Sequence, residues 1–299
     1  MAEVDYSKYM IRKPLFKMGG GITGRQSPAM TYMSNELIPG CNVYLELSWI
    51  KDIPKPNPYL FAHTHQQDMV VMYIGNTPEN PEYLGGEIEY YLGGQSLIFN
   101  RTAAIYIPKG VPHGPVIWKK FEKPHLELGL IKDGGSTREC WDNSMGQSRP
   151  KKKDDTDYTR YLVRKPIYRH DIQVNEGALG PILLYMCNDQ VAGSNIYIDY
   201  NWVFGMPDPH ISDHFHNFDE VVLHYGNDPD NPEYLGAEIE FTVNGQPLLF
   251  NTTTAVYIPK KVKHGPLLWK RFSKTHNQLP IIIGAGTHAE AAPAGYGGE

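Results

Sequence analysis

The chain has 299 residues, of which 41% are hydrophobic and 20% are charged, and its formal net charge is −5. This length suits two ordinary domains or one large one, and the composition is that of a soluble globular protein. The net charge argues against nucleic acid or an anionic membrane as a partner, and the cysteines show no Cys-x-x-Cys spacing, so we expect a cytoplasmic protein.

The predicted elements are short strands that follow one another along the chain, separated by Pro, Gly and Asn. No stretch shows helical periodicity over a dozen residues, and many short strands at close spacing indicate a sandwich or barrel. In the first half, we expect the strands at 42–49, 69–75, 87–94, 96–100 and 103–108.

The second half of the chain repeats the first. The stretch from His63 to Phe121 matches the stretch from His214 to Phe272 without a gap, at an offset of 151 residues. Each copy is far longer than a solenoid repeat, so we expect two complete domains. We place them at 1–145 and 146–299, with a flexible tail from about Gly284.

The second copy carries a candidate metal site. His214, His216 and Glu220 have the same parity, so an extended chain can point all three side chains to one face. His264 follows a later strand and a Pro-initiated turn, and it could reach the same centre. Three imidazoles and one carboxylate suit one divalent transition metal per chain, namely Mn, Fe, Zn, Ni or Co, with open coordination positions. The alternative is a chance group of surface histidines.

The first copy lacks one of these ligands. His63, His65 and His113 are present, but Met69 stands where the second copy has Glu220. Thioether sulfur suits Cu(I) better than a hard divalent ion. We therefore expect the N-terminal site to be degenerate, so that this barrel mainly completes the packing.

Two further histidines are candidates for catalysis alongside Glu220. His224 shares the parity of the ligands, so it could act as an acid–base group, although a core role is equally consistent. His210 lies in the loop before the ligands, where it could contact substrate or simply face solvent.

These residues resemble the motifs of the cupin superfamily. His-x-His, three residues, Glu, a short apolar strand and Gly226 look like the first cupin motif, with one residue fewer before the glycine. Residues 108–113, PKGVPH, match the second motif, and residues 259–264, PKKVKH, match it except at Lys261. The resemblance implies an all-β bicupin of two tandem double-stranded β-helix (jelly-roll) barrels. It also implies a metal held in the C-terminal barrel by His214, His216, Glu220 and His264.

The site residues and the resemblance together suggest an enzyme that acts on a small oxygenated substrate. Our leading expectation is hydrolytic C–C cleavage of a cyclic 1,3-dicarbonyl, because the chain loosely resembles the bicupin cyclohydrolases that open dihydrophloroglucinol. The alternatives are an Fe(II)-dependent ring-cleaving dioxygenase and a non-catalytic storage or sensing bicupin, since the fold does not choose among them. We expect a small-molecule partner and allow for a homo-oligomer.

Overall fold

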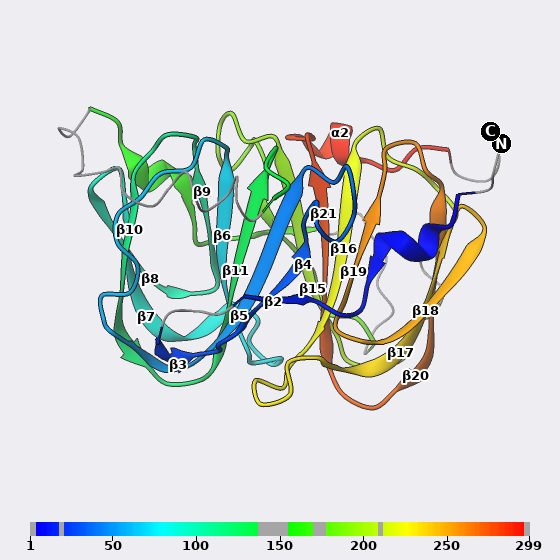
Figure 1. Ribbon diagram of the computed structural model, residues 1–299, viewed down its shortest axis with the longest axis horizontal. Coiled ribbons are helices and arrows are strands. Elements are labelled where there is room, and N and C mark those ends of the chain that lie inside the picture. The colour runs from blue at the N-terminus through cyan, green and yellow to red at the C-terminus, as the bar shows by residue number, and fades with distance from the viewer. Residues whose placement is uncertain (1–3, 18–20, 137–154, 170–177, 209–211, 296–299) are drawn as a thin grey trace. The chain divides into compact units, whose positions relative to one another are not determined.

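The computed structural model describes residues 4–17, 21–136, 155–169, 178–208 and 212–295 (Figure 1). It contains two compact units. We call residues 14–165 the first barrel, and residues 1–13 together with 166–299 the second barrel. Each unit combines one large antiparallel sheet with one three-stranded antiparallel sheet, which confirms the predicted all-β jelly-roll architecture.

The first barrel has a large sheet in the order β12-β9-β6-β11-β5-β4-β2, with β3 also paired to β5, and a small sheet in the order β10-β7-β8. Alternating side chains fill the space between the sheets: in β8, Leu97 and Phe99 are buried, while Ser96, Ile98 and Asn100 are exposed. Its elements are β2 (Leu15–Lys17), β3 (Thr23–Arg25), β4 (Ala29–Met33), β5 (Val43–Lys55), β6 (Met69–Gly75), β7 (Tyr83–Leu92), β8 (Gln95–Arg101), β9 (Ala103–Ile107), β10 (His113–Phe121), β11 (His125–Lys132), the 3-10 helix η2 (Tyr158–Tyr161) and β12 (Leu162–Val163).

The second barrel repeats this plan. Its large sheet has the order β1-β19-β16-β21-β15-β14-β13, and its small sheet has the order β18-β17-β20. Its elements are the 3-10 helix η1 (Tyr6–Tyr9), β1 (Met10–Ile11), β13 (Ile167–Arg169), β14 (Ile182–Met186), β15 (Ile196–Val203), β16 (Asp219–Gly226), β17 (Tyr234–Val243), β18 (Gln246–Thr252), β19 (Thr254–Ile258), β20 (His264–Phe272), β21 (His276–Ile283) and α2 (His288–Ala291).

Short arms at equivalent positions in the two repeats pair in an unexpected way. The arm before the first repeat, η1 and β1, pairs with β19 of the second barrel, and the arm before the second repeat, η2 and β12, pairs with β9 of the first barrel. Figure 1 shows the dark-blue η1 beside the orange strands. The boundaries expected from the sequence, 1–145 and 146–299, assign each arm to the other barrel, whereas the observed units begin after each arm.

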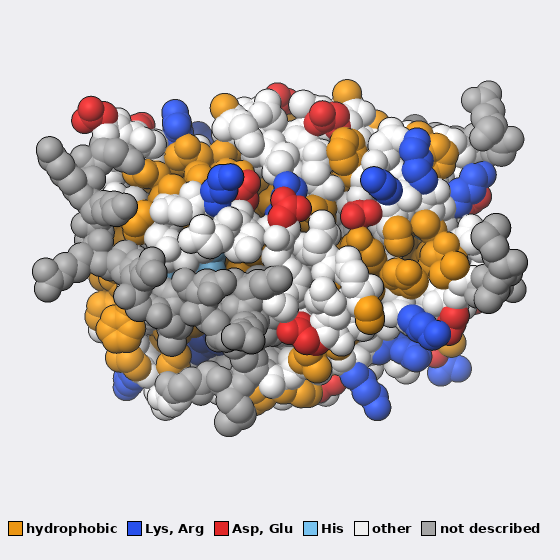
Figure 2. Space-filling model, turned by 45° about the horizontal axis from the view of Figure 1, so that its top comes forward, with side chains coloured by type: hydrophobic (Ala, Val, Ile, Leu, Met, Phe, Trp, Pro, Cys, Tyr) orange, Lys and Arg blue, Asp and Glu red, His pale blue; other side chains and the backbone are white. Residues whose placement is uncertain are grey.

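The C-terminal segment is also part of the second barrel. We expected a flexible tail from about Gly284, but α2 carries a capping box, Ala285 and Ala291 are buried, and Ala294 pairs with Phe215. Within the described residues, no helix is long and apolar enough to cross a membrane. Charged side chains of both signs are scattered over the face shown in Figure 2.

Candidate functional site

The second barrel brings three histidines together at the start of its strands. His214 and His264 face each other across an isolated antiparallel bridge, with backbone N–H···O distances of 3.0 and 2.8 Å. Their ring centroids lie 4.2 Å apart, and the ring of His216 lies 5.0 Å from the first and 5.3 Å from the second. The ligand nitrogens of all three lie within 4.8 Å of one another, so a single ion can reach them all.

Backbone carbonyls orient two of these rings. The Nδ1 atoms of His214 and His264 donate to the carbonyls of Ser212 and Val262, at 2.8 and 3.1 Å. In the neutral rings, this leaves each Nε2 as the lone-pair nitrogen that can face the shared centre. A partner that fixes the tautomer and the ring orientation in this way is typical of metal-binding histidines.

Glu220 completes the group. Its Oε2 lies 3.0 Å from Nε2 of His264 and 3.6 Å from Nε2 of His216, and the side chain is buried. Burial raises the pKa of Glu220, but His264 and His216 outweigh it and hold this pKa below its usual value. Burial and the neighbouring His264 lower the pKa of His214 to about 4. Glu220 is therefore anionic and His214 neutral at pH 7, which are the states that bind a metal. Burial lowers the pKa of His264, but Glu220 outweighs it and holds this pKa above its usual value, so a metal ion would displace a proton from His264.

These four side chains fit a divalent transition metal. Three imidazole nitrogens and one carboxylate oxygen form a donor set of borderline softness, and the arrangement leaves coordination positions for water or substrate. The structure thus brings together all four predicted ligands.

Three of the four ligands, His214, His216 and Glu220, line a cavity of about 190 Å³. The cavity wall also carries an ion pair, with Nη1 of Arg169 2.5 Å from Oδ2 of Asp199, and this guanidinium lies 5.8 Å from the ring centroid of Tyr197. The amides of Asn201 and Gln278 also line the cavity. Its apolar lining is formed by Leu179, Ile182, Pro280, Ile282, Ala291 and Pro293.

We did not single out Arg169, Asp199, Asn201 or Gln278 from the sequence. A signal was present, because Tyr197, Asp199 and Asn201 alternate along β15 and therefore share one face. Asp199 is also a carboxylate in a strand that is otherwise buried throughout its length. Arg169 and Gln278 lie on other strands, β13 and β21, and only the sheet order brings them to the same cavity.

α2 closes part of this cavity. The backbone carbonyls of Ala291 and Ala292 act on the His216 ring, where they oppose the lowering of its pKa by burial. Nδ1 of His288 lies 3.1 Å from the hydroxyl of Tyr197. The helix therefore contacts both a candidate ligand and the cavity wall.

The two other predicted catalytic histidines have different outcomes. His224 is fully buried, with its ring 5.4 Å from Phe250 and 6.1 Å from Trp269, and it is not among the residues that line the cavity. This location favours a core role. His210 lies outside the described residues.

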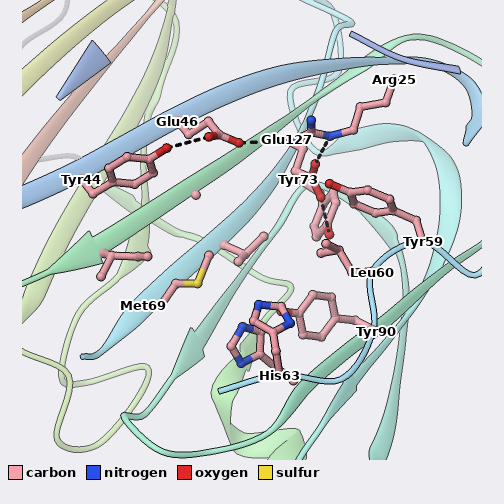
Figure 3. Close-up of a pocket in the computed structure, with 14 residues that line it drawn as sticks. Arg25, Tyr44, Glu46, Tyr59, Leu60, His63, Met69, Tyr73, Tyr90 and Glu127 are labelled. Atoms are coloured by element: carbon pink, nitrogen blue, oxygen red, sulfur yellow. Dashed lines mark hydrogen bonds and ion pairs between the residues drawn. The ribbon is translucent and has the colours of Figure 1, made fainter. Parts of the chain in front are cut away.

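The first barrel has the same histidine arrangement. The ring centroids of His63 and His113 lie 4.2 Å apart, and the ring of His65 lies 5.0 Å from each. Here the cavity is only about 50 Å³. Figure 3 shows His63 and Met69 on one side of it, with Arg25 and Glu127 on the other.

No protein-family model matches the sequence, and no curated protein matches it either. Solved structures do match. An oxalate decarboxylase structure covers 95% of this chain and 77% of its own, with a TM-score of 0.60 at 13% identity. A Bacillus subtilis oxalate decarboxylase described by its Mn(II) centres covers 89% and 74%, with a TM-score of 0.56 at 15% identity. AerE from Microcystis aeruginosa covers 90% and 97%, with a TM-score of 0.50 at 15% identity.

The chain therefore has the fold of these solved structures, with two jelly-roll barrels in one chain. This is the architecture that the resemblance of the sequence motifs to cupins implies.

Proposed function

We propose that the second barrel is the active site of a metal-dependent enzyme that acts on a small oxygenated molecule. More specifically, we propose the hydrolytic cleavage of a C–C bond in a cyclic 1,3-dicarbonyl such as dihydrophloroglucinol. The observation that carries this proposal is the cavity itself, whose lining combines three of the four candidate ligands with two amides and an internally neutralised ion pair.

The ligand set supports this chemistry. His214, His216, Glu220 and His264 would hold the ion. A divalent metal supplies polarisation of a carbonyl and a lowered pKa for water. In the overall reaction, hydroxide adds to one ring carbonyl, the bond to the central carbon breaks, and that carbon takes a proton, which leaves an open-chain keto acid.

The wall residues would position such a ring. The side-chain N–H groups of Asn201 and Gln278 can donate to ring oxygens that the metal does not contact, while Pro280 and Ile282 contact the ring face. Asp199, which Arg169 holds in an ion pair, would deliver or accept the proton.

The charge of the cavity supports a neutral dicarbonyl over a dicarboxylate. Arg169 is the single Lys or Arg among the described residues that line it, and Asp199 already neutralises this guanidinium. A second substrate carboxylate would therefore find no unpaired cation on the protein side. An uncharged carbonyl or hydroxyl needs none, because an amide N–H satisfies it.

Decarboxylation of a small carboxylic acid is a second candidate. It is favoured by the similarity to oxalate decarboxylases, which have the same double-barrel architecture. The two reactions differ in their products, because decarboxylation releases carbon dioxide whereas hydrolytic ring opening retains every carbon atom.

The test is turnover under strict anoxia with protein loaded with one divalent metal at a time. We expect dihydrophloroglucinol or 1,3-cyclohexanedione to yield one new carboxylate per turnover. The reaction should need no oxygen and should release no carbon dioxide. Glu220→Gln should lower kcat/KM at least about 100-fold through loss of the metal. Glu240→Gln on β17, which alters an ion pair with Lys270 on β20, is the matched control and should retain activity.

Three outcomes would contradict the proposal. A strict oxygen requirement would indicate the dioxygenase, and carbon dioxide release from oxalate or malonate without dione turnover would indicate the decarboxylase. Undiminished turnover by Glu220→Gln would show that these four ligands do not form the active site.

A further inference from the structure

We propose that the first barrel holds a second metal ion of a different kind: zinc(II), bound by three imidazoles alone, with water in the fourth position. The ligands are His63, His65 and His113, and Met69 is an apolar neighbour. This proposal revises our expectation of one metal per chain and does not depend on the proposed reaction.

The first observation is that the triad keeps its geometry without the carboxylate. His63 and His113 form the same antiparallel bridge as His214 and His264, with N–H···O distances of 3.0 and 2.9 Å. The three distances between ring centroids match those of the second barrel to within 0.3 Å. The backbone, rather than an ion pair with a carboxylate, therefore sets the convergence of the rings.

The second observation is a buried nitrogen without a partner. Nδ1 of His113 donates to the carbonyl of Val111 at 3.2 Å, so Nε2 carries the lone pair. His113 is 2% exposed, and its Nε2 has no hydrogen-bond partner. A buried acceptor left unsatisfied costs about 1–3 kcal/mol. An ion at the centre of the triad removes this cost for His113.

The nearby carboxylates are already committed to other groups. Oδ1 of Asp68 accepts from the backbone N–H of Lys109 at 2.9 Å. The two oxygens of Glu127 accept from Tyr73 at 3.0 Å and from Arg25 at 2.8 Å. Figure 3 shows Arg25, Tyr73 and Glu127 on the side of the cavity away from His63.

This donor set selects the ion. Imidazole suits zinc, copper and nickel, whereas manganese prefers oxygen ligands, so the loss of the carboxylate disfavours manganese in this barrel. Three histidines with water in the fourth position form an established open zinc geometry. The cavity of about 50 Å³ has room for water molecules but not for the ligand that a cavity of about 190 Å³ accepts.

Metal counting tests the proposal without reference to activity. Full-length protein is stripped with a chelator, reloaded with zinc(II) or manganese(II), desalted, and measured by elemental analysis. We expect about two zinc ions but one manganese ion per chain. His113→Ala should lose one zinc and keep the manganese, whereas the matched variant His264→Ala should keep one zinc and lose the manganese.

Met69 supplies the reciprocal test. Met69→Glu rebuilds the donor set of the second barrel and should raise manganese uptake from one ion to about two per chain. Met69→Leu removes the sulfur and should leave the two zinc ions in place. Circular dichroism checks that each variant is folded.

Several results would overturn the proposal. These are a single zinc per chain in the unaltered protein, an unchanged zinc count in His113→Ala, or two manganese ions before any substitution. Copper(I) retained in preference to zinc and lost in Met69→Leu would show that the thioether is a ligand. If Met69→Glu does not fold, the comparison of His113→Ala with His264→Ala still tests whether the first barrel binds zinc.

Discussion

At the scale of single residues, one more pair of buried histidines shows how the barrels use neutral imidazole in their packing. Nε2 of His125 accepts from Nε1 of Trp118 at 3.0 Å, and Nε2 of His276 accepts from Nε1 of Trp269 at the same distance. Each Nδ1 donates to a backbone carbonyl two residues earlier. Both ring nitrogens are thus satisfied in the neutral form, which gives this pair a structural role.

These two histidines predict a loss of stability in acid. Burial lowers the pKa of His125 and of His276 to about 4, from an ordinary value of 6.5. As the pH falls, the unfolded chain therefore takes up these protons before the folded chain does. The two neutral histidines make their full contribution to the free energy of unfolding above pH 6.5, and this contribution is lost as the pH falls towards 4. Each of these pKa shifts corresponds to about 3 kcal/mol in the free energy of unfolding.

The measurement is urea unfolding of metal-free protein between pH 7 and pH 4. His276→Gln keeps an acceptor for Trp269 but cannot titrate, so its stability should fall less steeply with acid than that of the unaltered protein. Equal slopes would contradict the assignment.

A second residue-scale prediction concerns the turn that carries the last histidine of each triad. Lys261 has φ +67°, where the first barrel has Gly110 at φ +75°. A non-glycine residue in this left-handed region costs about 1 kcal/mol or slightly more, although Lys261 recovers part of it by placing its ammonium 4.7 Å from the ring centroid of Phe215. We expect Lys261→Gly to raise the free energy of unfolding by up to about 1 kcal/mol.

Gly110→Lys is the reciprocal variant and should lower that free energy by about 1 kcal/mol. A Cβ at Gly110 would meet no atom within 4 Å, so the backbone conformation alone is tested. Unfolding midpoints at fixed metal content measure both changes, and a neutral Gly110→Lys would disprove the strain argument.

At the scale of elements, α2 is a short helix that depends on its cap. Oγ1 of Thr287 accepts from the N–H of Glu290 at 3.2 Å, and Oε2 of Glu290 accepts from the N–H groups of Gly286 and Thr287 at 2.9 and 3.0 Å. A four-residue helix has little intrinsic stability, so this cap and the contacts to His216 and Tyr197 hold it in place.

Thr287→Ala should therefore destabilise the folded conformation of α2 by about 1 kcal/mol. We expect faster amide hydrogen exchange over residues 284–295 and a higher KM for the substrate, with an unchanged metal content. Thr287→Ser keeps the oxygen and serves as the control. Unaltered exchange in Thr287→Ala would mean that packing alone holds the helix.

At the scale of the whole molecule, the exchanged arms determine which residues form each barrel. The N–H of Tyr6 donates to Oε1 of Gln246 in the second barrel, and the N–H of Tyr158 donates to Oε1 of Gln95 in the first, both at 2.9 Å. Both tyrosine rings are buried in the core of the barrel that their arm joins. A cut at 145/146 would therefore remove one arm from each barrel.

The arms predict a reciprocal pair of variants. Tyr6→Ala should destabilise the second barrel and Tyr158→Ala the first, each by about 3 kcal/mol, because each removes a buried aromatic ring. Hydrogen exchange should accelerate at β19 in Tyr6→Ala and at β9 in Tyr158→Ala. Faster exchange at β9 in Tyr6→Ala, or at β19 in Tyr158→Ala, would refute the pairing.

Local patterns in the sequence were sufficient to predict two all-β barrels and the group formed by His214, His216, Glu220 and His264. The reason is that strand parity sets the face of a side chain and the turn motif places His264, so both act over a few residues. The same parity left His224 open between the cavity and the core, and the structure favours the core, because inward-facing residues farther along the strand face the core.

The tertiary structure alone decided three other features. The first is the pairing of the arms: the partners of β1 are more than 240 residues away in the sequence, and those of β12 are about 58 residues away. Backbone hydrogen bonds between strands would form equally well with either barrel, so the local sequence of an arm does not specify its partner. The Arg169–Asp199 wall joins β13 and β15, which are not adjacent in the sheet, so only the sheet order brings these side chains together. The preserved triad of the first barrel depends on a backbone bridge between His63 and His113, which loss of the carboxylate at position 69 leaves intact because the bridge does not involve that side chain.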